Sequence, residues 1–280
     1  MSIIARIETG ELKQLFHIEN SKGESGQQIL SLRFGKKYGS FSISGKTGAA
    51  LYELAYCSVS CRDENELIDF FSNFPSLQNS FYQVQVAYDF SESIFIPSGV
   101  YDAESAGALL NITGGDTTTA NVVSELIPGW QLYNVYAVPK ELQQWITNRL
   151  PAARFWHQYS LGIKHISVTE YNSSMLIDIQ KDNFTVLVAG NKKILLAQTF
   201  DYTTPEDVLY YLLKTAERFS LPQQEVSLQL SGLIDKQSAL YKELYQYFIN
   251  IEFRNAEWGV QGEYPAHFFT SLNDLAKCAS

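Results

Sequence analysis

Cysteine is scarce in this chain of 280 residues, which has only Cys57, Cys61 and Cys278. Three cysteines at these positions make no disulfide framework. Cys57 and Cys61 supply two of the four ligands that a structural zinc needs, and no histidine or further cysteine lies near them in the sequence. We therefore expect structural thiols, no metal centre and a cytoplasmic location.

Long apolar runs and basic clusters are also missing. No stretch reaches the roughly 18 apolar residues of a membrane-spanning helix, and residues 1–11 lack the basic start and apolar core of a secretion signal. The 30 acidic residues outnumber the 21 basic ones, for a net charge of −9, and lysine and arginine are nowhere concentrated. This balance excludes the electrostatic footprint of a nucleic-acid-binding protein and argues against adsorption to an anionic membrane.

What is present is the composition of a globular protein. Apolar residues make up 45% of the chain and charged residues 18%, which predicts an ordinary packed core, and 280 residues suffice for two lobes. Aromatic residues make up 14%, which leaves open both an aromatic core and an aromatic surface for protein contacts.

The second half of the chain has the clearest pattern of elements. In chain order, the predicted elements are strands at 175–179, 184–188 and 194–200, a helix at 205–219, a strand at 226–230, a helix at 237–248 and a strand at 249–253. Short polar turns between the first three strands are typical of an antiparallel meander. Thr204 is a good N-cap for the first helix, with Pro205 in its first position and Asp207 three residues after the cap.

The first half repeats that order. Its predicted elements are strands at 30–34, 41–43 and 51–59, a helix at 64–74 and a strand at 82–87. Val84 follows Leu30 by 54 positions, and Val226 follows Leu176 by 50 positions. Two runs of the same elements at nearly the same spacing indicate a duplicated fold.

An insertion extends the first half over about residues 93–150. It contains a strand at 93–97, a short helix at 103–110, a strand at 132–138 and a helix at 139–150. We place the boundary between lobes in the polar stretch near residue 171, so that the first lobe covers 1–171 and the second, with a C-terminal extension, covers 172–280. The fold class is α/β, with a mixed sheet in each lobe.

The chain also resembles a known family. The residues that carry this resemblance are Phe200–Leu213 (FDYTTPEDVLYYLL), Leu228–Gly232 (LQLSG) and Tyr264–Phe269 (YPAHFF). They are similar to an uncharacterised bacterial family, domain of unknown function 3822, which has an actin-like ATPase fold. More distantly, the order of elements and the insertion resemble the pilus-assembly and cell-division branch of the actin-like ATPase superfamily. The resemblance implies a duplicated, ribonuclease H-like fold over nearly the whole chain.

The resemblance also implies where a nucleotide would bind. Actin-like ATPases hold phosphates with one Asp-x-Gly hairpin turn per lobe, in which the Asp organises metal and water. The equivalent turn in the first lobe, 32–37, contains no acid, and the turn at 178–182 has Asp178 but no glycine. We therefore expect no catalytic residue. Residual binding of ATP and magnesium stays open, with Lys36, Lys37, Asp178 and Gly232 as the candidate residues.

Residues 44–48 (SGKTG) invite a different interpretation, as a phosphate-binding P-loop. That motif requires a glycine five positions before Gly45, and Ser40 stands there. Phe41 and Ile43 alternate with polar residues as in a strand, so a hairpin turn is the better account.

The predicted helix at 237–248 carries two stripes. Leu240, Leu244 and Phe248 form one, and Tyr241 and Tyr245 form the next. The first stripe is typical of a core face; the second indicates either a wider buried face or a protein interface, where tyrosines are common.

Our hypothesis is a non-catalytic actin-like protein that acts through contacts with an unidentified protein partner. The alternative is a divergent ATP-binding protein or slow ATPase with its site in the cleft between the lobes. A hydrolase or transferase that uses the cleft for another phosphorylated ligand is a third hypothesis.

Overall fold

The computed structural model describes residues 13–20, 27–115, 117–166, 173–258 and 264–278, which form two compact units. Unit 1 comprises residues 1–160 and 275–280, and unit 2 comprises residues 161–274. The boundary at 171/172 that the sequence predicts lies outside the described residues. No helix within the described ranges is long and apolar enough to cross a bilayer.

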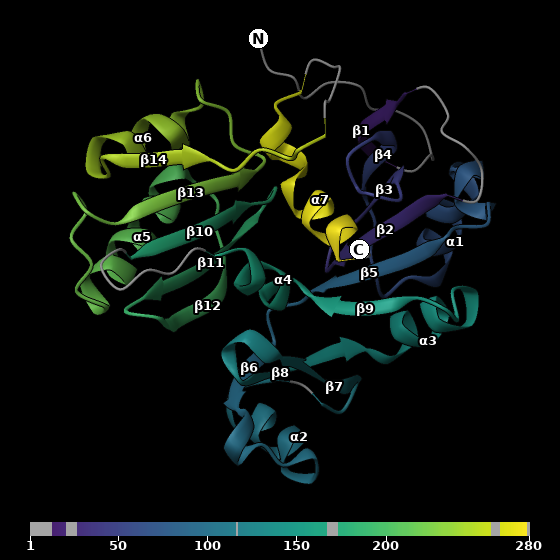
Figure 1. Ribbon diagram of the computed structural model, residues 1–280, viewed down its shortest axis with the longest axis horizontal. Coiled ribbons are helices and arrows are strands. Elements are labelled where there is room, and N and C mark those ends of the chain that lie inside the picture. The colour runs from purple at the N-terminus through teal and green to yellow at the C-terminus, as the bar shows by residue number, and fades with distance from the viewer. Residues whose placement is uncertain (1–12, 21–26, 116, 167–172, 259–263, 279–280) are drawn as a thin grey trace. The chain divides into compact units, whose positions relative to one another are not determined.

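Unit 1 is built on a six-stranded sheet with the order β1-β4-β3-β2-β5-β9 (Figure 1). The strands are β1 (Lys13–Glu19), β2 (Gln28–Gly35), β3 (Tyr38–Gly45), β4 (Leu51–Ser58), β5 (Gln83–Asp89) and β9 (Arg154–His157). β2, β3 and β4 form an antiparallel meander, and β5 and β9 continue the sheet in parallel with β2. Helices α1 (Glu64–Asn73) and α3 (Lys140–Arg149) pack on the sheet.

Unit 2 repeats this arrangement in a five-stranded sheet with the order β12-β11-β10-β13-β14. The strands are β10 (Ser174–Ile179), β11 (Asn183–Gly190), β12 (Lys193–Asp201), β13 (Ser227–Gly232) and β14 (Asn250–Phe253), and the helices that pack on the sheet are α5 (Pro205–Arg218) and α6 (Ala239–Tyr247). The orders β4-β3-β2-β5 and β12-β11-β10-β13 match element for element. The predicted duplication, and the mixed sheet in each half, are confirmed.

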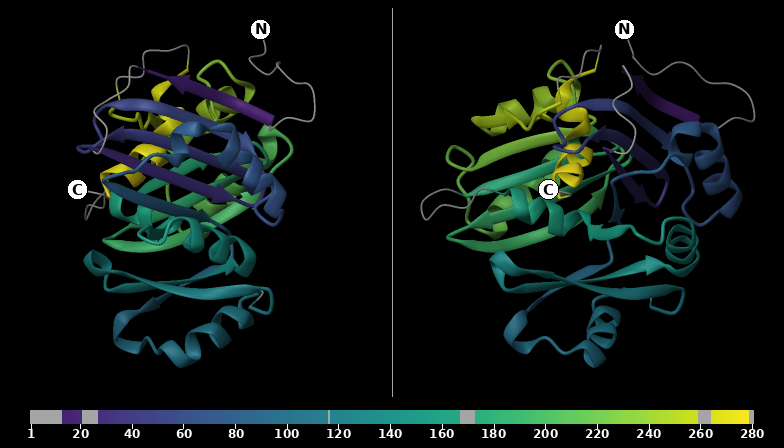
Figure 2. Two further views of the ribbon diagram at one scale, coloured as in Figure 1. Left: turned by 90° about the vertical axis from the view of Figure 1, so that its right-hand side faces the viewer. Right: turned by 45° about the vertical axis from the view of Figure 1, so that its right-hand side comes forward.

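A separate three-stranded sheet lies between β5 and β9 in the chain, in the predicted insertion. Its order is β6-β8-β7, from β6 (Ser93–Pro97), β8 (Leu132–Pro139) and β7 (Ala120–Ile127). Helix α2 (Ala103–Ile112) covers one face of this sheet (Figure 2). Ile96, Ala106 and Val135 form the small core between them.

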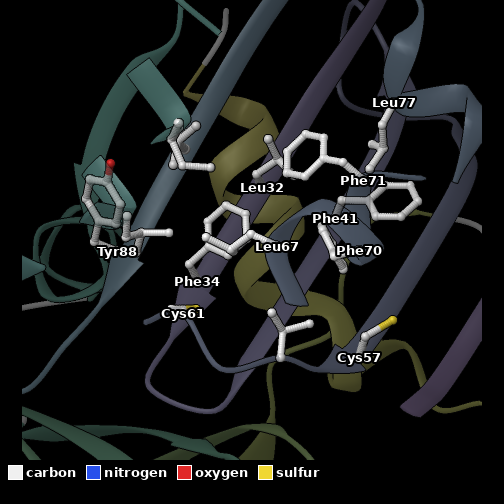
Figure 3. Close-up of a cluster of buried hydrophobic side chains, with 14 of the residues drawn as sticks. Leu32, Phe34, Phe41, Cys57, Cys61, Leu67, Phe70, Phe71, Leu77 and Tyr88 are labelled. Carbon is white, nitrogen blue, oxygen red and sulfur yellow. The ribbon is translucent and has the colours of Figure 1, made fainter. Parts of the chain in front are cut away.

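The core of unit 1 is rich in aromatic side chains (Figure 3). Helix α1 begins at its N-cap Asp63, whose carboxylate accepts a hydrogen bond from the backbone N–H of Asn65 at 2.9 Å. Phe70 of this helix is fully buried and meets Phe34 and Phe41 of the sheet in edge-to-face contacts at 6.0 Å. These contacts fix α1 across β2 and β3, because aromatic pairs favour this geometry.

Helix α5 of unit 2 begins as the sequence predicts. The Asp207 carboxylate accepts hydrogen bonds from the backbone N–H groups of Thr203 and Thr204, both at 2.9 Å. These bonds lower the pKa of Asp207 and satisfy N–H groups that precede the helix. Val208 and Leu212 then face the core.

Two short elements in the described part complete the fold. Helix α4 (Gln158–His165) follows β9, and helix α7 (Thr270–Lys277) lies at the C-terminal end. Gly162 of α4 packs against Leu187 of β11 so closely that a Cβ atom would lie 2.0 Å from Leu187 Cδ1. The glycine thus lets the helix approach the sheet closely, and a larger side chain would displace Leu187.

The buried positions of two cysteines predict their reactivity. Cys57 and Cys61 lie in the core of unit 1 (Figure 3), and burial raises the pKa of Cys57 to about 12 and that of Cys61 as well. Cys278 is partly exposed. Iodoacetamide treatment of the folded protein should therefore modify Cys278 and spare the other two, as read by mass spectrometry, because the thiolate is the reactive form. Urea-unfolded protein, the control, should be modified at all three; equal labelling of Cys57 before and after unfolding would contradict its burial.

Candidate functional site

The first candidate turn joins β2 to β3 and carries an arginine where an acid is expected. Counting back from Gly35, the acid of an Asp-x-Gly turn would stand at position 33, which is Arg33. Arg33 is 4% exposed. A buried guanidinium requires a partner, because an unpaired charge in the interior costs several kcal/mol.

Asp89, at the end of β5, is that partner. The parallel pairing of β2 and β5 places Asp89 opposite Gly35, and Arg33 Nη2 lies 2.9 Å from Asp89 Oδ2. Arg33 Nη2 also donates to Gln158 Oε1, where β9 passes into α4. The charge of this turn is therefore neutralised from within unit 1, by the strand beside it.

Tyr38, at the β3 end of the same turn, also binds Asp89. Its hydroxyl donates to Asp89 Oδ2, and its ring lies 5.5 Å from the Arg33 guanidinium. Burial raises the pKa of Tyr38 well above its usual range, so the phenol keeps the proton that it donates. A Cβ atom at Gly35 would lie 2.3 Å from Tyr38 Cε1. The glycine of this turn thus makes room for the tyrosine ring.

Lys36 and Lys37 occupy the tip of the turn and are exposed. Lys36 Nζ lies 3.3 Å from Glu92 Oε1 and 3.4 Å from Ser91 Oγ, both just after β5. The backbone carbonyl of Lys37 accepts a hydrogen bond from the Val59 N–H at 3.1 Å. Lys36 is therefore paired with an acid of its own unit.

The second candidate turn joins β10 to β11 in unit 2. Asp178 stands in β10, and Gln180 occupies the position of the glycine in an Asp-x-Gly turn. Both oxygens of the Asp178 carboxylate accept hydrogen bonds, Oδ1 from Ser231 Oγ at 3.0 Å and Oδ2 from Gln180 Nε2 at 2.9 Å. The Gln180 carbonyl in turn accepts from the Tyr202 hydroxyl at 2.7 Å. This carboxylate is held by its neighbours in the sheet.

Gly232 lies beside Asp178, because β10 and β13 pair in parallel with Ile179 opposite Gly232. Its φ is +81°, and a Cβ atom would lie 2.1 Å from the Ile179 carbonyl oxygen. The Leu233 N–H donates to that oxygen at 2.7 Å. Gly232 is thus required by the close approach of β13 to β10, where any side chain would be strained.

Of the four candidate nucleotide residues, the structure therefore brings Asp178 and Gly232 together in unit 2. Lys36 and Lys37 lie in unit 1. Among the described residues, no group of three or more His, Cys, Asp or Glu side chains is arranged to hold a metal ion. Residues 46–50 form the turn between β3 and β4, closed by the Gly45 N–H on the Ala50 carbonyl at 2.8 Å, so the hairpin interpretation of 44–48 is confirmed.

A buried histidine adjoins the first turn. His157 Nε2 lies 2.9 Å from the Phe90 carbonyl, and Nδ1 accepts from the Tyr159 N–H at 3.1 Å. One ring nitrogen donates and the other accepts, so the imidazole is neutral. Burial lowers the pKa of His157 to about 4. His157 therefore ties the start of α4 to the chain after β5.

Tyr241 and Tyr245 differ in exposure. Tyr241 is half-buried and stacks on Phe253 of β14 at 5.4 Å, whereas Tyr245 is 65% exposed and stacks on Tyr241 at 6.1 Å. Phe253 stacks on His267 at 4.1 Å, and His267 Nε2 lies 2.6 Å from the Ile234 carbonyl. His267 thus has a structural hydrogen bond, and four rings form a column from the interior to the surface.

Comparison with known proteins places this arrangement in a known fold. The sequence matches the family described as "Protein of unknown function (DUF3822)" over residues 17–251. The structure is similar to a Bacteroides thetaiotaomicron VPI-5482 protein with actin-like ATPase fold and unknown function, with a TM-score of 0.76 and 21% identity over 91% of this chain and 97% of that one. It is also similar to a chain of the PilM–PilN type IV pilus biogenesis complex, with a TM-score of 0.55 and 12% identity over 90% and 98% of the two chains. Comparison with curated proteins found no similar sequence. The predicted actin-like fold is confirmed.

The residues that sequence reasoning missed are Arg33, Tyr38, Asp89 and Gln158. One signal was available: Arg33 interrupts the apolar run of β2, and charged residues are rarely buried without a partner. The partner itself could not be identified, because Asp89 lies 56 positions away and Gln158 lies 125 positions away.

The buried pair predicts a strong effect of single substitutions. Arg33→Met leaves Asp89 buried without the guanidinium and should lower the free energy of unfolding by about 3–5 kcal/mol in urea titrations. The double variant Arg33→Met/Asp89→Leu should lose less than Arg33→Met alone, because it strands no charge. A single variant as stable as the wild type would show that the pair does not hold this turn.

His157 predicts a pH dependence of stability. Its pKa is about 4 in the folded protein against an ordinary value of 6.5, so the unfolded chain binds the extra proton first as the pH falls. Stability should therefore decline between pH 6.5 and about 4, by up to about 1.4 kcal/mol per pH unit from this group. Urea titrations at several pH values should show a shallower decline for His157→Asn than for the wild type. Identical slopes would exclude His157 as the cause.

Proposed function

We propose that this chain, which belongs to the DUF3822 family and has an actin-like ATPase fold, is a non-catalytic member of that fold that acts through contacts with another protein. Its location in this proposal is the cytoplasm, which agrees with the acidic composition and with the lack of any disulfide among the three cysteines. The proposal assigns no catalytic residue and no metal to the chain.

The observation that carries the proposal is Arg33 bound to Asp89 in the first turn. An acid at position 33 would attract a metal ion, whereas Arg33 repels one, and Asp89 already neutralises Arg33 at 2.9 Å. The Tyr38 hydroxyl donates a further hydrogen bond to Asp89, and Gln158 Oε1 accepts one from Arg33. Because the charged groups at this turn are paired with each other, we assign these residues a structural role.

The second turn supports the same conclusion by different means. Asp178 has both carboxylate oxygens engaged by Ser231 and Gln180, and the glycine that would let backbone N–H groups approach a phosphate is replaced by Gln180. The full-length similarity to a chain of the PilM–PilN complex adds a precedent, since that complex pairs this fold with a protein partner.

The proposal predicts that nucleotides leave stability unchanged. A ligand present at 100 times its dissociation constant adds about 2.7 kcal/mol, which would raise the unfolding midpoint by several degrees. Thermal unfolding with and without millimolar Mg-ATP or Mg-ADP should give the same midpoint.

A magnesium-dependent rise with both nucleotides would contradict the proposal and favour the divergent ATP-binding protein or slow ATPase. Asp178→Asn is then the variant to compare, because it removes the charge and keeps the shape. Gly232→Ala is unsuitable, since its Cβ atom would meet the Ile179 carbonyl at 2.1 Å and disturb the sheet in any case.

A further inference from the structure

One edge of the unit 2 sheet is formed by strand β14. β14 is the last strand in the order and pairs only with β13 among the described strands (Figure 1). The Arg254 N–H donates to the Leu230 carbonyl at 2.8 Å, so the even-numbered residues direct their backbone groups toward β13. Ile251 and Phe253 therefore direct their N–H and C=O groups outward, where they form a template for another strand.

An aromatic surface lies beside this edge. Tyr245, 65% exposed, continues the column of stacked rings formed by Tyr241, Phe253 and His267. Ile249, which precedes β14, is also 65% exposed. A strand added to β14 would place alternate side chains over these apolar groups, and burial of tyrosine is a frequent source of binding energy.

The opposite face of the edge carries an exposed carboxylate. Glu252 is exposed on β14, on the side away from Tyr241, and Glu257 is exposed a few residues later. Arg254 is the one basic residue in the stretch 249–257, and its guanidinium is bound to Asp274 at 2.6 Å. Basic side chains on an incoming strand would therefore meet complementary charge.

We propose that β14 accepts an extended segment of a partner protein, in which apolar residues alternate with lysine or arginine, as a sixth strand of the unit 2 sheet. The apolar residues cover Tyr245, Tyr241 and Ile249, and the basic residues lie next to Glu252. A second copy of this chain is a poorer occupant, because it would bring its own Glu252 to the same face. This inference rests on the proposed function, for which it specifies the binding mode and the chemistry of the partner.

The test is a selection from a displayed library of random peptides of about ten residues, the upper length of an ordinary strand. Peptides that bind the wild-type protein should show the alternation of apolar and basic residues. Their affinity, measured by fluorescence anisotropy, should fall about tenfold or more with Tyr245→Ala, as for a central tyrosine of an interface. Selected peptides that are acidic or lack the alternation would overturn the proposal.

Ile251→Pro separates strand addition from simple surface contact. It removes one outward N–H and retains the bonds to β13, since proline is tolerated where the N–H of an edge strand faces solvent. Binding should fall about tenfold or more, and further than with Ile251→Ala, which loses the same core contact and keeps the outward N–H. Tyr210→Ala is the matched control: Tyr210 is 57% exposed, and its neighbour Tyr211 stacks on Phe200 of β12, at the other edge of the sheet.

The outcomes separate this inference from the proposed function. Binding that depends on Tyr245 and is unaffected by Ile251→Pro would overturn strand addition and leave a protein-contact role standing. Self-association of the wild type that Ile251→Pro abolishes would show that the edge takes a second copy, and would overturn the choice of partner. Nucleotide binding is measured independently, because neither variant lies in the turns at Gly35 or Asp178.

Discussion

The buried ion pair between Arg33 and Asp89 constrains several segments of the first half of this molecule. A guanidinium at 4% exposure is tolerated only when its charge is matched. That requirement links β2, the end of β5, the β2–β3 turn through Tyr38 and the start of α4 through Gln158. His157, beside Gln158, adds a second tie between the same segments through the Phe90 carbonyl. These contacts bind the β2–β3 turn to two other segments of unit 1.

The candidate turns of the two units have the same place in the topology but different polar contacts. In unit 1 the turn carries Arg33, which Asp89 of the neighbouring strand neutralises; in unit 2 it carries Asp178, which accepts a hydrogen bond from Gln180. Both solutions satisfy buried polar groups within a unit, as the interior of a protein demands. By contrast, the outward backbone groups of the edge strand β14 pair with no other described strand.

Local pattern was sufficient where an element is long and its periodicity clear. Helix α5 begins at Pro205, as its capping residues predict, and the strand at Ser93–Pro97 has the predicted bounds. Five other elements, β1, β7, β9, α4 and α7, were missed, and three of them have a physical reason that the structure shows. Half of the β7 residues are exposed and show little apolar alternation, β9 has only four residues, and α4 contains Gly162, a poor helix former that packs closely on Leu187.

The sequence by itself determined the class of fold and its duplication, because these depend on residue order and spacing along the chain. It also marked Tyr241 and Tyr245 as neighbours on one helix. Only the tertiary structure decided that Asp89 reaches Arg33, and that Tyr241 stacks on Phe253 of the edge strand β14. Such contacts join residues far apart in the chain, and strand pairing and burial, which no local pattern encodes, bring them together.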